Sequence, residues 1–296
     1  MFRFARRRVA VSRILRYSSL LAFLAIGLPT STTSGAERKI LVAGLKSPES
    51  VAVTSDGRIF VSMLGKMTVK GDGEIVEVKD GKALPVATGM DDPAGLTVRD
   101  GDLYCADKTR VWQIDRAGKA SVYLEGDAFP IKAKSLNDIT TGPNGDLFVS
   151  DSGNFTSNGV VFRISPQKKV TVVISHPTVA ELKGPNGILC EGSDHLLLND
   201  FFARRLLRVS ITDGKVSEVA KDLGGADGLA RDKRGRLFVS DWGKGRVFVI
   251  DDANSQPRVL LEGFKAPADL MVDPNQDRLL IPDMRAGTLS EVSLGE

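Results

Sequence analysis

Four oxygen-bearing side chains occupy the same place in successive copies of one repeated sequence pattern: Glu49, Asn137, Asn186 and Asp227. Two are carboxylates and two are carboxamides, which are the donors that a hard cation prefers over nitrogen or sulfur ligands. A loosely specified oxygen cage that can also take waters suits calcium better than magnesium. If the fold brings these side chains together in a narrow channel, their burial without a cation would be costly. The sequence therefore predicts a divalent-cation site, with calcium as the preferred ion.

The repeat that carries these residues appears six times, beginning at Ser47, Asp92, Ser135, Gly184, Gly225 and Ala266. Each copy is a short apolar strand, a turn rich in Gly, Asp, Asn or Pro, and a second apolar strand. Two further strands follow, for example 160–164 and 170–174, which gives four strands per unit. Repeats of this length are typical of propeller blades, and helical periodicity is almost absent. We therefore expect an all-β fold, a six-bladed β-propeller.

The two ends of the chain predict how the ring closes. The last unit ends after its third strand, 288–293, and a strand that could complete it lies at 39–44, directly before the first unit. Pairing these strands would leave no open sheet edge. The first strand of every blade lines the central channel, so residues at one repeat position should meet there: Glu49, Ala94, Asn137, Asn186, Asp227 and Ala268.

Residues 1–36 read as a secretory signal peptide. Six arginines and no acid precede a short apolar run, 20–28, and a small-residue end at 34–36. The run is about half the ~20 residues that a membrane span needs, although an uncleaved anchor is an alternative. We expect one domain over 37–296, a periplasmic or secreted location, and no stable membrane insertion after cleavage. Without the leader the formal net charge of +3 becomes −3, which gives no support to nucleic-acid binding.

Other residues with possible chemistry have simpler interpretations. Cys105 and Cys190 fall at unlike places in their repeats, so we expect two buried thiols rather than a disulfide. The histidines, His176 and His195, are expected at the surface. Acids end the second strand in five of the six repeats, and we expect them to hold turns: Asp107, Asp151, Asp200, Asp241 and Asp283.

The sequence around the four oxygen donors resembles that of the calcium-dependent lactonase propellers. This family comprises gluconolactonase and the senescence marker protein (regucalcin), and more distantly the paraoxonases. The resemblance rests on LND at 136–138, GPNG at 184–187 and DGL at 227–229, and covers essentially the whole chain after the leader. It implies that Glu49, Asn186 and Asp227 hold the cation, and that Asn137 binds either the cation or the substrate.

The chain departs from this family at one informative position. Gluconolactonases carry an Arg two residues before the blade-three Asn, where it grips sugar hydroxyls. This chain has Ser135 at that position and Lys134 beside it. The resemblance therefore implies hydrolysis of lactones or related small esters without specifying a sugar, and it leaves Lys134 and Asn137 as candidate substrate-binding residues.

For the reaction, we expect the cation to polarise the lactone carbonyl and stabilise the oxyanion that forms as water attacks. Asp227, or in second place Glu49, would take the proton from that water, with Asp138 as the reserve base. Specificity should come from the loops that follow the second strands. Apolar residues in or near these loops are candidates for the pocket wall: Phe155, Phe201, Phe202 and Trp242.

Two other functions are compatible with the same fold. One is a non-catalytic propeller, like the NHL-repeat modules, that binds a protein, peptide or sugar around a structural ion. The other is a strictosidine-synthase-like propeller, disfavoured because no catalytic Glu can be placed. The sequence contains no phosphate-binding loop, nucleophile elbow, zinc motif or dinucleotide fingerprint.

Overall fold

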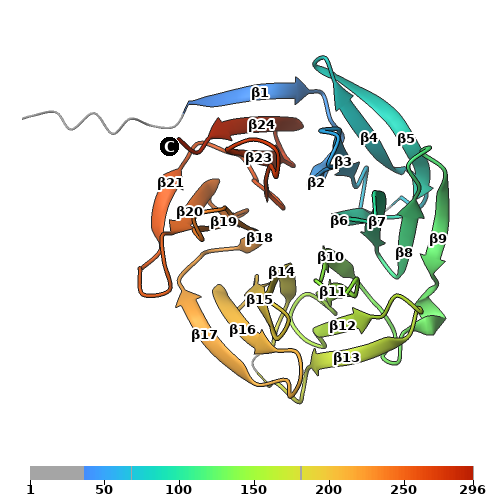
Figure 1. The fold of residues 1–296 in the computed structure, drawn as a ribbon, viewed down its shortest axis with the longest axis vertical. Coiled ribbons are helices and arrows are strands. Elements are labelled where there is room, and N and C mark those ends of the chain that lie inside the picture. The colour runs from blue at the N-terminus through green and yellow to red at the C-terminus, as the bar shows by residue number, and fades with distance from the viewer. Residues whose placement is uncertain (1–36, 68, 181, 296) are drawn as a thin grey trace, which may run out of the picture. The chain divides into compact units, whose positions relative to one another are not determined.

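The computed structural model describes residues 37–67, 69–180 and 182–295, which form six four-stranded antiparallel sheets around a central axis (Figure 1). The predicted six-bladed β-propeller is confirmed. The proposed signal peptide, 1–36, lies outside the described residues. Within the described ranges no helix is long and apolar enough to span a membrane, and the one helical element is a 3₁₀ turn, η1 (Gly126–Ala128).

Five blades are built from consecutive strands. Blade one contains β2 (Pro48–Val53), β3 (Ile59–Met63), β4 (Gly73–Lys79) and β5 (Lys82–Met90). Blade two contains β6 (Pro93–Arg99), β7 (Asp102–Asp107), β8 (Arg110–Ile114) and β9 (Ala120–Leu124). Blade three contains β10 (Leu136–Thr141), β11 (Leu147–Asp151), β12 (Val160–Ile164) and β13 (Val170–Ser175). Blade four contains β14 (Pro185–Glu191), β15 (His195–Asp200), β16 (Arg205–Ser210) and β17 (Val216–Lys221). Blade five contains β18 (Ala226–Arg231), β19 (Leu237–Asp241), β20 (Arg246–Ile250) and β21 (Arg258–Leu261).

Blade six joins the two ends of the described chain. It contains β22 (Met271–Val272), β23 (Arg278–Asp283), β24 (Thr288–Ser293) and, as its outer strand, β1 (Arg38–Ala43). The antiparallel pairing runs from Arg38 opposite Val292 to Ala43 opposite Thr288. The predicted closure of the ring by the N-terminal strand is therefore confirmed, and it pairs an edge that would otherwise be open.

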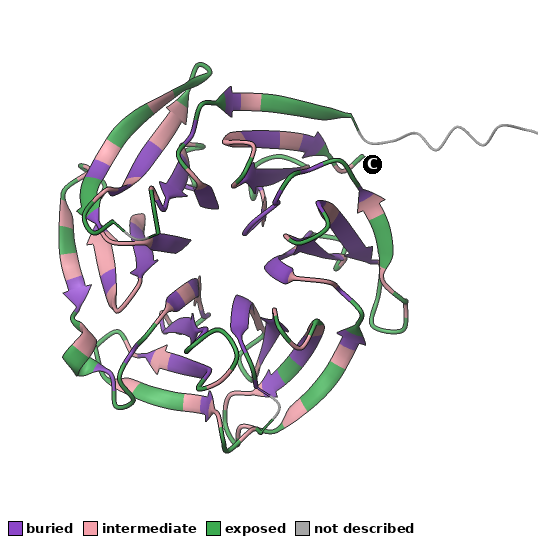
Figure 2. Cartoon of the chain, turned by 180° about the vertical axis from the view of Figure 1, so that it is seen from behind, coloured by how far each residue is buried: buried purple, intermediate pink, exposed green. Residues whose placement is uncertain are grey.

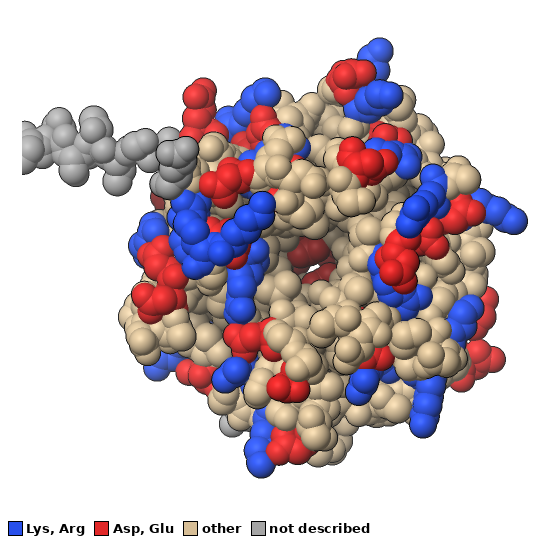
Figure 3. Space-filling model, in the orientation of Figure 1, with Lys and Arg blue, Asp and Glu red and all other residues tan. Residues whose placement is uncertain are grey.

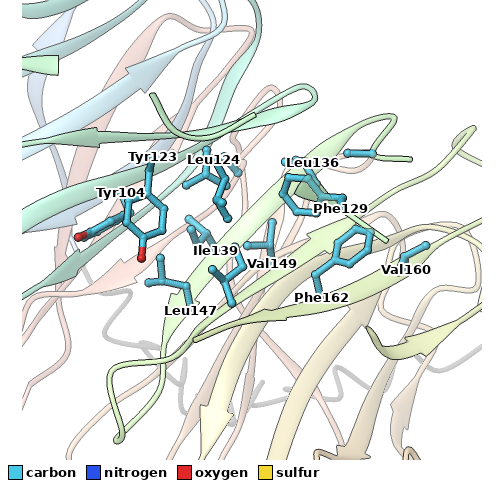
Figure 4. Close-up of a cluster of buried hydrophobic side chains, with 14 residues drawn as sticks. Tyr104, Tyr123, Leu124, Phe129, Leu136, Ile139, Leu147, Val149, Val160 and Phe162 are labelled. Carbon is cyan, nitrogen blue, oxygen red and sulfur yellow. The ribbon is translucent and has the colours of Figure 1, made fainter. Parts of the chain in front are cut away.

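The hydrophobic core consists of six clusters, each between two neighbouring blades. Between blades two and three, the Phe129 and Phe162 rings meet edge-to-face with centroids 4.9 Å apart (Figure 4). Burial falls from the inner strands of each blade toward the fourth strand (Figure 2). Because dense apolar packing fixes each blade against the next, the inner strands are held at defined positions around the channel.

The acids that end the second strands hold the turns of their own blades, as predicted. Asp200 is fully buried and accepts the backbone N–H groups of Lys183 at 2.9 Å and Gly184 at 3.0 Å, just before β14. It also accepts the N–H of Ala203 at 3.1 Å, after β15. The equivalent acids of the other four blades make the same kind of contacts. In blades three to six the carboxylate thus joins the loop before strand one to the loop after strand two. In blade two Asp107 instead accepts the indole N–H of Trp112 on β8 at 2.7 Å.

Replacing Asp241 with Asn should lower the free energy of unfolding by about 3 kcal/mol, because a buried ion pair and a backbone contact are lost together. Asp241 is fully buried, accepts the Gly225 N–H at 3.0 Å and pairs with Arg246 at 2.7 Å. Urea denaturation measures the change. The matched control is Asp213→Asn at the exposed pair with Lys215, which should leave stability essentially unchanged. Equal losses in both variants would contradict the structural role.

Candidate metal centre and cavity

A β-bulge in the first strand turns two successive residues toward the channel in five of the blades. The register between strands one and two shifts between Pro48 and Val51 in blade one, and at the equivalent place in blades two to five. Second-strand side chains brace the bulge: the Ser62 hydroxyl accepts the Ser50 N–H at 2.9 Å. In blade four the Asn199 amide donates to the Asp227 carbonyl of the next blade at 2.9 Å. The bulge thus fixes the direction of the channel-lining side chains.

The four predicted oxygen donors are the first bulge residues of blades one, three, four and five. Glu49, Asn186 and Asp227 are buried, with 3%, 6% and 5% of their surface exposed, and Asn137 is half-buried. One oxygen of each is buried without any hydrogen-bond partner: Glu49 Oε2, Asn137 Oδ1, Asn186 Oδ1 and Asp227 Oδ1. Buried acceptors without partners are rare and costly, so four at one repeat position indicate that something else satisfies them.

The chemistry of these donors fits a hard divalent cation. Two carboxylates and two amide oxygens come from four different blades, and all four residues line the same cavity. Among the described residues there is no group of three or more His, Cys, Asp or Glu that could hold a metal, so nitrogen- and sulfur-rich centres find no match there. A site that combines two acids with two carboxamides is of the type that calcium accepts.

The channel is strongly acidic. Burial, and next the negative charge of Asp227, raises the pKa of Glu49 well above its ordinary range. Burial, and next the charge of Asp269, raises the pKa of Asp227 in the same direction. Acidic side chains are visible within the central opening, while basic residues lie toward its periphery (Figure 3). A positive charge at this point would favour the ionised carboxylates.

The second residue of the bulge faces a different part of the channel. Asp138 accepts the backbone N–H groups of Ile139 and Ile188, both at 2.7 Å, and so joins blades three and four. Asp269, at the equivalent repeat position of blade six, accepts a hydrogen bond from the Ser50 hydroxyl at 2.5 Å across the junction of blades six and one. Both acids line the mouth of the channel opposite the four donors. The structure therefore does not bring Asp138, the predicted reserve base, into the cavity that the donors face.

Asp269 should make the cation-free protein less stable as pH rises. Burial raises its pKa from 3.8 to about 7 despite the hydrogen bond from Ser50. Between those pH values the folded protein keeps a proton that the unfolded chain has released, so the free energy of unfolding falls from about pH 4 to about pH 7. In chelator, Asp269→Asn should therefore show a shallower decline. Urea titrations across this range measure it, and parallel curves for both proteins would contradict the assignment.

The four donors form the floor of a cavity of about 550 Å³. Besides Asn137 in the floor, the wall includes the other candidate substrate-binding and pocket-wall residues that the sequence predicted: Lys134, Phe155, Phe201, Phe202 and Trp242. Neither histidine lines this cavity. Cys105 and Cys190 are free thiols, as expected, and burial raises the pKa of both. Cys105 is buried as predicted, whereas Cys190 is only partly buried.

Sequence reasoning predicted two members of a second ring of cavity-lining residues, Phe201 and Trp242, but missed the ring as a whole. The residue directly after strand two lines the cavity in all six blades: Leu64, Lys108, Ser152, Phe201, Trp242 and Met284. We call this set the wall ring. In five blades the backbone N–H of this residue is fixed by the carbonyl two positions before the channel donor, for example Phe201 to Gly184 at 2.9 Å. The repeat register would have found the ring, although its side chains share no chemistry.

An ion pair beside the wall ring was also missed. Asp92 occupies the repeat position of Ser135 and binds Lys108 with an N–O distance of 2.6 Å, and both residues line the cavity. Burial raises the pKa of Asp92, while the hydrogen bond from Lys108 opposes that shift. Together with Lys134, this pair makes the blade-two and blade-three side of the cavity its charged side.

The fold and this site define a six-bladed β-propeller with buried oxygen donors at the floor of an open cavity. The chain belongs to the SMP-30/gluconolactonase/LRE-like family, whose model matches residues 72–282. The resemblance drawn from the sequence is thus confirmed at the level of the family. A comparison with curated proteins finds no match.

Solved structures share the fold at low sequence identity. A gluconolactonase from Xanthomonas campestris superposes with a TM-score of 0.74 at 18% identity, covering 88% of this chain and 90% of the other. A calcium-binding regucalcin from Agrobacterium tumefaciens gives 0.69 at 18%, covering 87% and 93%. A catalytically inactive virginiamycin B lyase from Staphylococcus aureus gives 0.59 at 18%, covering 88% and 99%. A lyase among these neighbours shows that the fold alone does not fix the reaction.

Proposed function

We propose that this chain is an exported, calcium-dependent hydrolase of lactones or related small esters. The observation that carries the proposal is the convergence of four unpaired oxygens from four blades on the floor of an open cavity. The gluconolactonase neighbour and the family support the reaction class, and the calcium-binding regucalcin supports the ion. Export rests on the arginine-rich leader and its apolar run within residues 1–36.

Four residues would hold the cation: Glu49, Asn137, Asn186 and Asp227. A bound divalent cation supplies Lewis acidity beside the substrate carbonyl and positive charge for the developing oxyanion. Asp227 would bind the ion through Oδ1, which has no hydrogen-bond partner in the protein. Its other carboxylate oxygen accepts the proton of the attacking water. The ring C–O bond breaks, and the proton passes to the alkoxide to give the hydroxy acid. Asn137 is the most exposed of the four, so its amide can also donate to a substrate oxygen.

A lactone panel with and without calcium tests the proposal. Purified protein is stripped with chelator and assayed against glucono-δ-lactone, γ-butyrolactone and dihydrocoumarin before and after calcium is restored. Turnover should be absent in chelator and return with calcium. Calcium-dependent thermal stabilisation without turnover would favour the non-catalytic binding propeller. If calcium produced no turnover and no thermal stabilisation, the central cation site itself would be refuted.

A further inference from the structure

The wall ring divides the cavity into two chemically different sides. Its four apolar members follow one another around the ring in blades four, five, six and one: Phe201, Trp242, Met284 and Leu64. The two polar members, Lys108 and Ser152, belong to blades two and three. A substrate on the donor floor therefore meets an apolar surface along most of the circumference and polar groups along the rest.

The aromatic part of the wall is held rigidly. Phe201 packs edge-to-face against Phe202 with ring centroids 5.0 Å apart and against Trp242 at 6.2 Å. The rings lie against two glycines, since a Cβ at Gly184 would come within 2.6 Å of Phe202 and one at Gly225 within 3.0 Å of Phe201. Glycine at these positions allows the aromatic side chains to cover the backbone. The wall is thus a packed surface with a fixed shape.

The rim of the same cavity exposes large apolar side chains to solvent. Met67, Phe155 and Phe202 line the cavity and keep 62%, 44% and 41% of their surface exposed. Apolar groups gathered at one mouth mark a surface that a ligand or partner covers. Hydroxyl groups of a sugar would need hydrogen-bonding partners, and the charged cavity residues above the floor are confined to blades two and three: Asp92, Lys108 and Lys134.

We propose that the preferred substrate is a lactone or ester bearing an extended alkyl or aryl group, rather than a polyhydroxylated sugar lactone. This inference rests on the proposed function for its reacting group. The carbonyl lies over the donor floor, and the apolar group lies along Phe201, Trp242 and the rim residue Phe155. Each methylene that leaves water for this wall strengthens binding until the wall is filled.

The test is a series of γ-lactones from butyrolactone to dodecalactone, assayed with calcium and compared with glucono-δ-lactone. Full burial of each added methylene would raise kcat/KM by up to about fourfold. The corresponding γ-lactams, which resist hydrolysis, are titrated calorimetrically to follow binding without turnover. Lactam affinity that rises with chain length supports the apolar wall, whether or not any lactone is hydrolysed. If affinity rises but no lactone is hydrolysed, only the proposed function fails. Hydrolysis with no chain-length effect, or a preference for glucono-δ-lactone, overturns the inference and leaves the proposed function standing.

Two substitutions connect this effect to the wall. Phe155→Ser should reduce the advantage of dodecalactone over butyrolactone by about tenfold, because one aromatic surface is removed. The matched control is Leu84→Ser on β5, since Leu84 is also 44% exposed but lies outside the cavity. The control should keep the full chain-length dependence in both lactone turnover and lactam binding. Equal responses of the two variants would overturn the assignment of the apolar group to this wall.

Discussion

Replacing Asp227 with Asn should reduce lactone turnover at saturating calcium by at least about a hundredfold, which is the smaller end of what loss of a general base costs. Asp227 is buried on blade five, its backbone is fixed by the Asn199 amide, and Oδ1 has no partner. Asparagine keeps the size of the side chain and one oxygen donor, but it cannot accept the proton of the attacking water. The measurement is kcat over a calcium titration, with calcium affinity followed by calorimetry.

The calcium titration separates the two roles assigned to Asp227. A ligand role alone predicts weaker calcium binding and full recovery of kcat at high calcium. A role as proton acceptor predicts that kcat stays low after the site is saturated. The comparison variant is Asp138→Asn, which alters the neighbouring carboxylate that faces the opposite mouth. If Asp138→Asn lost turnover while Asp227→Asn kept it, the base would be misassigned.

The ring of donors could be predicted because every blade places the same repeat position on one axis. Turns and strand lengths recur closely enough that Glu49 and Asp227, far apart in the chain, align by register alone. The role of the strand-end acids could also be predicted, because a carboxylate that recurs in five blades is expected to have the same structural role in each. The hydrogen bonds that Asp200 accepts from the loop N–H groups show this role. Repetition thus carries more information here than the chemistry of any single segment.

The structure adds what register alone could not supply. Regular alternation along a strand cannot show that a bulge turns both Asn137 and Asp138 into the channel, or that they face different mouths. Phe201 and Trp242 were predicted as pocket-wall residues, but the wall ring as a whole was not recognised, for another reason. Its members range from Lys108 to Trp242, so no shared residue type marks their common position. Such positions are found from register and backbone contacts, not from side-chain chemistry.

The second large effect concerns stability, and its sign should reverse with calcium. In chelator at about pH 8, Glu49→Gln should be more stable than the wild type by about 1 kcal/mol, because the folded wild type must either bury a carboxylate charge without a partner or take up a proton that the unfolded chain has released. Burial and the nearby charges of Asp227, Asp269 and Asp138 all oppose ionisation of Glu49 and raise its pKa. With calcium, the wild type should gain about 2.7 kcal/mol at a hundredfold excess over the dissociation constant. The variant should gain less, because it has lost one ligand charge.

Urea denaturation of both proteins, with chelator and with saturating calcium, measures this reversal. The matched control is Glu77→Gln on β4, where Glu77 pairs with Arg58 away from the channel. That variant should shift stability by the same amount in both conditions, because its charge does not face the bound ion. If Glu49→Gln behaved like the control, Glu49 would not be a ligand. A reversal confined to Glu49→Gln would show that the acidic channel is costly on its own and becomes stabilising through the cation.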